Sequence, residues 1–121
     1  MSTAATIAVA LIGVLHVYIL VLEMFLWEKP AGLRAFRQTQ AAATASKVLA
    51  ANQGLYNGFL AAGLFWGVLL GTAGRDVSVF FLVCVLVAGV YGAATANKKI
   101  LFVQAVPAAI GLALVLLGSV S

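Results

Sequence analysis

The stretch ATIAVALIGVLHVYILVLEMFLW (Ala5–Trp27) is apolar almost throughout, carries one histidine and one glutamate, and stops at EKP (Glu28–Pro30). A helix that crosses a bilayer needs about 20 predominantly apolar residues, and proline breaks a helix because it lacks the backbone N–H. Three further runs of this kind cover residues 46–71, 77–96 and 100–119. Together with residues 5–27 they predict an all-α fold, a bundle of four transmembrane helices in a single integral membrane domain (1–121).

The composition excludes a water-soluble chain. Of the 121 residues, 64% are hydrophobic and 8% are charged, whereas soluble domains average about 45–50% apolar and about 25% charged residues. A soluble globular enzyme, a disordered tail and a nucleic-acid-binding module are therefore excluded. The lone cysteine, Cys84, cannot form an intramolecular disulfide, and no Cys/His cluster offers a structural zinc site. We expect neither a metal nor a cofactor.

The positive charges indicate the orientation in the membrane. Two connections on one side of the predicted bundle hold most of them, and Arg75 lies on the other side. The residues in these two connections are Lys29, Arg34, Arg37, Lys47, Lys98 and Lys99. The positive-inside rule places both connections in the cytoplasm. We therefore expect a multi-pass protein of the inner (plasma) membrane with both termini outside the cytoplasm.

Two connections carry further predictions. Leu33, Phe36 and Gln40 fall on one side at helical spacing within residues 28–45. This pattern predicts a short interfacial amphipathic helix between the first two transmembrane helices, and a solvated loop is the alternative. Residues 72–76 predict a tight turn, in which Asp76 is the expected N-cap of the third helix.

Small residues recur at intervals that suit helix packing in membranes. They include Gly54, Gly58, Gly63, Gly67, Gly71, Gly89 and Ala93. This spacing lets helix backbones approach closely where lipid supplies no hydrophobic driving force. We expect it to serve the bundle itself, and the alternative is a homo-oligomer formed through the glycine-rich faces.

Polar residues inside the apolar runs are the best indicators of function, because each is costly in hydrocarbon unless it is paired or hydrated. His16 and Glu23 are seven residues apart and share one helix face. The other three helices contribute Asn52, Gln53, Tyr56, Asn57, Tyr91 and Gln104. Counted at about 1.5 Å per residue, nearly all of them fall in the cytoplasmic half. They predict a polar pocket inside the bundle that opens toward the cytoplasm.

The same residues suggest roles within this pocket. A carboxyl at hydrocarbon depth must pair with a cation, accept hydrogen bonds or carry a proton. Glu23 and His16 are therefore the candidate catalytic residues, as proton carriers. The ligand-binding candidates are Asn52, Gln53, Tyr56, Asn57, Tyr91 and Gln104.

One motif in each predicted helix resembles a known family. The motifs are HVYILVLEMFLW (His16–Trp27), NQGLYNGFLAAGL (Asn52–Leu64), VAGVYGAAT (Val87–Thr95) and ILFVQAVPA (Ile100–Ala108). They resemble an uncharacterised family of small bacterial four-helix membrane proteins, known as domain of unknown function one-three-zero-four. The resemblance implies a four-helix integral protein of the bacterial inner membrane. It brings no established activity, substrate or cofactor.

Three classes of function remain open. The first is binding of a small amphipathic or lipid-like molecule in the polar pocket, with acid–base chemistry by Glu23 and His16. The second is a structural membrane subunit whose polar groups only hold the bundle together. The third is a small proton-coupled transporter, because four helices and an acidic residue in the first span match the general plan of small multidrug exporters. The expected partners are membrane lipid and a lipophilic small molecule, and nucleic acid is not expected.

Overall fold

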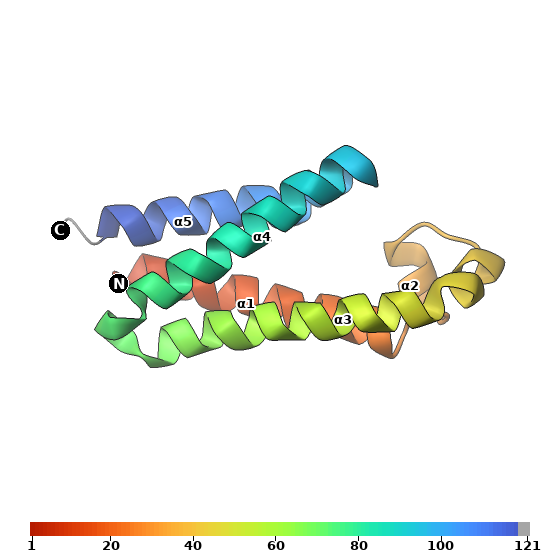
Figure 1. The fold of residues 1–121 in the computed structure, drawn as a ribbon, viewed down its shortest axis with the longest axis horizontal. Coiled ribbons are helices and arrows are strands. Elements are labelled where there is room, and N and C mark those ends of the chain that lie inside the picture. The colour runs from red at the N-terminus through yellow and green to blue at the C-terminus, as the bar shows by residue number, and fades with distance from the viewer. Residues whose placement is uncertain (119–121) are drawn as a thin grey trace. The chain divides into compact units, whose positions relative to one another are not determined.

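The computed structural model describes residues 1–118, which form helices and short connections, with no strand among these residues. The all-α class predicted from the sequence is confirmed. In chain order the elements are α1 (Thr3–Met24), α2 (Pro30–Ala35), α3 (Gln40–Leu69), the 3₁₀ turn η1 (Gly71–Gly74), α4 (Arg75–Thr95), the π-helical turn η2 (Leu101–Ala105) and α5 (Val106–Gly118) (Figure 1).

The first helix ends at Met24 rather than at the expected Trp27. The backbone widens there, because the N–H of Leu26 donates to the carbonyl of Val21, five residues earlier, at 3.1 Å. Pro30 then begins α2. Proline suits the first turn of a helix, where its missing N–H would have had no intrahelical partner. A short helix therefore lies between the first and second long helices.

The second long helix begins at Gln40, earlier than the expected residue 46. Arg37, with φ +49°, turns the chain just before it. The side-chain oxygen of Thr39 accepts a hydrogen bond from the N–H of Ala42 at 3.1 Å, which caps the helix start. Segment 41–45 is rich in alanine, which has the highest helix propensity. The helix therefore includes this segment and begins directly after the Thr39 cap, although alanine side chains are only weakly apolar.

The turn before α4 differs from the expectation in one respect. Asp76 is not the N-cap, because α4 begins at Arg75 and Gly74 occupies the cap position without a side-chain hydrogen bond. Asp76 lies in the first turn instead, where a carboxylate favourably meets the helix dipole. Its Oδ1 accepts a hydrogen bond from Arg75 at 3.2 Å. Gly71 supplies the turn with a left-handed backbone, φ +64°.

The last apolar run is helical over Leu101–Gly118, and the final residue of the expected range, Ser119, lies outside the described residues. Its first turn is π-helical, with the N–H of Val106 donating to the carbonyl of Leu101. Pro107 explains this wider turn. Proline offers no N–H to the carbonyl four residues earlier, and its ring crowds that carbonyl.

The chain divides into two compact units. Unit 1 comprises residues 1–13 and 62–121, and unit 2 comprises residues 14–61. In unit 1, α4 packs along η2 and α5, and a Cβ placed on Gly89 would lie 2.8 Å from the backbone nitrogen of Ala105. In unit 2, the second half of α1 lies against α3. The glycine spacing thus serves close helix packing within each unit.

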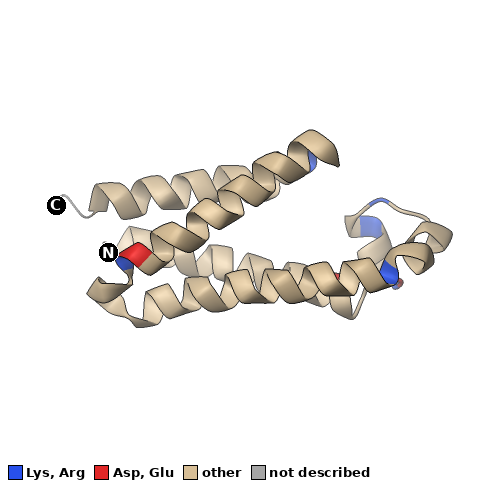
Figure 2. Ribbon diagram, viewed as in Figure 1, with Lys and Arg blue, Asp and Glu red and all other residues tan. Residues whose placement is uncertain are grey.

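Three of the helical segments are long and apolar enough to cross a membrane, namely Thr3–Met24, Gly71–Thr95 and Leu101–Gly118. They indicate a membrane protein. The 30-residue helix α3 is not among the three segments, since its amides Asn52, Gln53 and Asn57 lower its hydropathy. Figure 2 shows charged residues of unit 2 around α2 and the start of α3, and those of unit 1 at the two ends of α4.

Candidate functional site

Among the Asp, Glu, Lys and Arg side chains that the structure describes, Glu23 is the buried one. It lies in the last turn of α1 and is 6% exposed. Its Oε1 accepts a hydrogen bond from Nδ2 of Asn57 at 2.6 Å, and the same Nδ2 lies 3.2 Å from the backbone carbonyl of Gln53, one turn earlier in α3. The backbone carbonyl therefore holds the amide of Asn57 in place, and the amide in turn meets the carboxyl across the helix pair.

A glycine makes this contact possible. A Cβ on Gly54 would lie 2.5 Å from Cγ of Met24 and 3.1 Å from Cβ of Glu23. A Cβ on Gly58 would lie 2.8 Å from Cδ1 of Leu20. A side chain at Gly54 would therefore crowd Met24, Glu23 and the backbone carbonyl of Leu20, whereas one at Gly58 would displace the terminal methyl group of Leu20.

The segment after α1 folds back onto the start of α3. Trp27 donates from its indole N–H to Oγ of Ser46 at 3.2 Å. Glu28 accepts a hydrogen bond from the hydroxyl of Thr44 at 2.7 Å on Oε2, and its Oε1 lies 4.0 Å from Nζ of Lys47. Each contact is partly exposed and contributes little alone. Together they fix the position of the charged groups beside Glu23.

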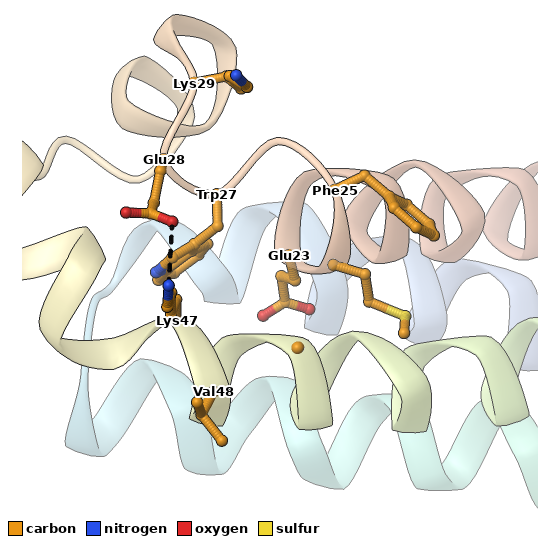
Figure 3. A pocket seen from close by; sticks show the side chains of 9 residues that line it. Glu23, Phe25, Trp27, Glu28, Lys29, Lys47 and Val48 are labelled. Atoms are coloured by element: carbon orange, nitrogen blue, oxygen red, sulfur yellow. Dashed lines mark ion pairs between the residues drawn. The ribbon is translucent and has the colours of Figure 1, made fainter.

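A pocket of about 390 Å³ lies between these two features, in the size range of small-molecule sites. Its charged lining consists of Glu23, Glu28, Lys29 and Lys47, and its apolar lining of Met24, Phe25, Trp27, Val48 and Ala51. Figure 3 shows the carboxyl of Glu23 on the inner side of α1 and the Glu28–Lys47 ion pair beside Trp27. The pocket therefore offers both polar and apolar contacts from within unit 2.

Unit 1 contains another hollow, of about 370 Å³, which is lined by Trp66, Asp76, Val77, Phe80 and Phe81. The carboxylate of Asp76 points into the open, with its side chain 94% exposed, and it is paired with Arg75. The hollow contains no buried polar group. The pocket at Glu23 is therefore the better candidate for a functional site.

The structure groups only some of the residues expected at the site. Glu23 and Asn57 are in contact, and His16 is fully buried two turns before Glu23 on the same face of α1. Asn52, Gln53 and Tyr56 lie on the exposed side of α3. Tyr91, 70% exposed on α4, and Gln104, half-buried in η2, belong to unit 1. Their participation in the site stays a prediction.

Sequence reasoning assigned Lys29 and Lys47 to membrane topology only, and it did not place Glu28 in a site. These residues nonetheless line the pocket. Their position in the sequence could have indicated this role. They lie at the ends of two apolar runs, and one of these runs contains the carboxyl of Glu23. Within residues 1–118, no three His, Cys, Asp or Glu side chains gather as metal ligands would.

Comparisons with known proteins give a family and no activity. Residues 10–116 match the family described as "Protein of unknown function (DUF1304)". The chain is also similar to the uncharacterized protein YpaA of Lactococcus lactis subsp. lactis, with 31% identity over 105 residues that cover 84% of this chain and 88% of YpaA. No solved structure matches. A family match over most of the chain and a relative of nearly equal span agree with each other, and the chain belongs to this family of proteins of unknown function.

Proposed function

We propose that this chain is an inner-membrane protein that binds a small amphipathic or lipid-like molecule in the pocket at Glu23. The observation that carries the proposal is the composition of that pocket. A buried carboxyl, held by one amide, forms part of a pocket that also has charged residues and apolar walls. An amphipathic molecule presents the same combination, a polar group joined to an apolar body.

The membrane placement belongs to the same proposal. Helix α3 is a further span in addition to the three segments named above, and it is the second span in chain order. Its 30 residues extend about 45 Å, which exceeds a hydrocarbon core of about 30 Å. Helix α2 lies at the cytoplasmic interface with Arg34 and Arg37 exposed. Four spans and the positive-inside rule then put both termini outside and the pocket, with Lys29 and Lys47, at the cytoplasmic side.

Glu23 supplies the acid–base chemistry of the proposal. Its Oε1 is occupied by Asn57, and within the described part of the chain no hydrogen bond reaches Oε2. This second oxygen can accept a ligand's donor or carry a proton. His16 lies seven residues earlier, about 10 Å along the helix axis. A proton therefore passes between Glu23 and His16 only through an intervening water molecule or ligand group.

Bound amphiphiles can be measured directly. The protein is purified in mild detergent as wild type and as Glu23→Gln, His16→Ala, Lys47→Gln and Asp76→Asn, and co-purified lipophilic molecules are quantified by mass spectrometry. Glu23→Gln and Lys47→Gln should retain about tenfold less of a defined amphiphile, because a hydrogen bond to a charged group contributes about 1.5–3 kcal/mol. The amount retained by His16→Ala tests whether the second candidate proton carrier contributes to binding.

Asp76→Asn is the matched control, since Asp76 is an exposed carboxylate outside the pocket, and it should retain the wild-type amount. Equal retention by all variants would overturn the proposal. If the Glu23 variant then also showed a lower unfolding temperature, the polar groups would serve the structure of the bundle alone.

A further inference from the structure

The residues that line the Glu23 pocket all belong to unit 2, and their polar groups are not all engaged by one another. Glu28 has partners on both carboxylate oxygens, because Oε2 accepts a hydrogen bond from Thr44 at 2.7 Å and Oε1 lies 4.0 Å from Nζ of Lys47. Glu23 differs. Asn57 donates to its Oε1, and no hydrogen bond from the described residues reaches its Oε2. One acceptor oxygen of the pocket therefore remains available to a ligand.

Lys29 is a cation of the same pocket without an acidic partner. It lies at the N-cap position of α2, where its side chain makes no capping hydrogen bond. Two of the three Asp and Glu residues in the sequence, Glu28 and Asp76, are paired with Lys47 and Arg75, and the third lines the pocket itself. In the part of the chain that the structure describes, no carboxylate lies within ion-pair distance of Lys29. The pocket wall therefore holds a lysine that no carboxylate neutralises.

A head group that complements this pocket supplies both an anion and a hydrogen-bond donor. Lys29 and Lys47 present ammonium groups from two elements, the start of α2 and α3 (Figure 3). A phosphate has several strong acceptor oxygens that point in different directions, so it can accept from both lysines at once. A carboxylate offers only two oxygens in one plane. Oε2 of Glu23 then accepts from a hydroxyl or ammonium group of the same head.

We propose that the amphiphile of the Glu23 pocket is a phospholipid-like molecule whose head group carries a phosphate, bound by Lys29 and Lys47, and a hydrogen-bond donor, bound by Glu23. Its acyl chain lies against the apolar part of the lining, which includes Phe25 and Val48. The inference rests on the proposed function, because it names the class of ligand for the same site. It is tested by comparing head groups on one and the same pair of acyl chains.

Four lipids with identical brominated chains make this comparison. Trp27 lines the pocket, and Trp66→Phe leaves it as the one tryptophan, since the sequence contains two. Bromine quenches tryptophan fluorescence on contact, so each lipid is titrated into the protein in a maltoside detergent. Phosphatidylglycerol and phosphatidylethanolamine carry a phosphate and a donor. They should quench at about tenfold lower mole fraction than phosphatidylcholine, which lacks the donor, and diacylglycerol, which lacks the phosphate, because charge-assisted hydrogen bonds are the strong ones.

Two lysine and arginine variants of the Trp66→Phe protein test the phosphate contact. Lys29→Gln should raise the mole fraction of phosphatidylglycerol needed for half-maximal quenching about tenfold and leave that of diacylglycerol unchanged, because it removes a cation that meets only the phosphate. Arg34→Gln is the matched control. It removes a cation from the same connection, but Arg34 does not line the pocket, and its titration should match that of the Trp66→Phe protein.

Two outcomes would overturn the head-group assignment. An equal loss in the Lys29 and Arg34 variants would mean that the basic connection as a whole attracts anionic lipid. Quenching by phosphatidylglycerol without phosphatidylethanolamine would mean that net charge is recognised, and that no donor binds Glu23. Inorganic phosphate at millimolar concentration should leave the quenching unchanged, and complete displacement would assign the site to a soluble phosphate compound instead of a lipid.

The same titrations distinguish failure of this inference from failure of the proposed function. The reference is a Trp27→Phe protein, in which Trp66 reports lipid contact outside the pocket. If no lipid quenches Trp27 at a lower mole fraction than it quenches Trp66, the pocket binds no amphiphile and the proposed function fails. If all four lipids quench Trp27 at the same low mole fraction, amphiphile binding stands and only the head-group inference is wrong.

Discussion

At the scale of single residues, Asn57 is the hydrogen-bond partner of the buried carboxyl of Glu23. The carboxyl is 6% exposed, and the amide of Asn57 is its hydrogen-bond donor among the described residues. A buried carboxyl that loses its donor retains the cost of leaving water. The sequence contains Asn52 and Asn57 on the same helix, and both were expected at the pocket. The two residues differ in the side of α3 on which they lie. Asn57 faces α1, whereas Asn52 is exposed.

Replacing Asn57 by Leu should lower the free energy of unfolding by about 1–3 kcal/mol, because the acceptor on Glu23 is then buried without its donor. The measurement is thermal unfolding in dilute detergent, followed by tryptophan fluorescence. Asn52→Leu is the control on the same helix, and as an exposed position it should change stability by less than about 0.5 kcal/mol. Equal effects of the two substitutions would show that the Asn57–Glu23 bond is energetically unimportant.

At the scale of helices, the glycines determine how closely α3 approaches its neighbours. Gly54 and Gly58 face α1 in unit 2, whereas Gly63 and Gly67 face α4 in unit 1. The spacing of these glycines was visible in the sequence. The sequence did not show which pair of glycines faces which helix. Successive residues of a helix point in different directions, and tertiary packing determines which helix lies against each face.

Gly54→Val should destabilise the α1–α3 pair by about 1–3 kcal/mol, the usual cost of forcing extra atoms into a packed contact. The Cβ alone would lie 2.5 Å from Cγ of Met24. Unfolding temperature reports the loss, and Ala62→Val, at an exposed position of the same helix, is the matched control. A Gly54→Val protein as stable as this control would mean that the two helices are not in close contact.

At the scale of the whole chain, the distribution of charge sets the proposed topology. The described charged residues lie in the end turns of helices or in connections, apart from Lys47, which lies seven residues after the start of α3. Because charged side chains are costly in hydrocarbon, such a distribution is typical of membrane-spanning helices. In the proposed topology, the excess of Lys and Arg on one side favours a single orientation.

Thiol labelling with a membrane-impermeant reagent tests this orientation. In a protein with Cys84→Ala, single cysteines at residues 2 and 72 should react in intact cells. Cysteines at residues 39 and 97 should react only after the inner membrane is made permeable. The reverse pattern would invert the orientation, and reaction of residues 39 and 72 from the same side would exclude α3 as a span.

The sequence by itself determined the helical class, the apolar helices and their approximate limits, because a long uncharged run leaves the backbone no alternative to internal hydrogen bonds in lipid. It also marked Glu23 and Asn57 as residues of unusual position. Tertiary structure alone decided that Asn57 and not Asn52 binds Glu23, that Thr39 caps the start of α3, and that Glu28 and Lys47 form part of the pocket. These features depend on how one helix is rotated against another and on where a connection folds back. Both result from the sum of many small packing contacts, which no local pattern of residues records.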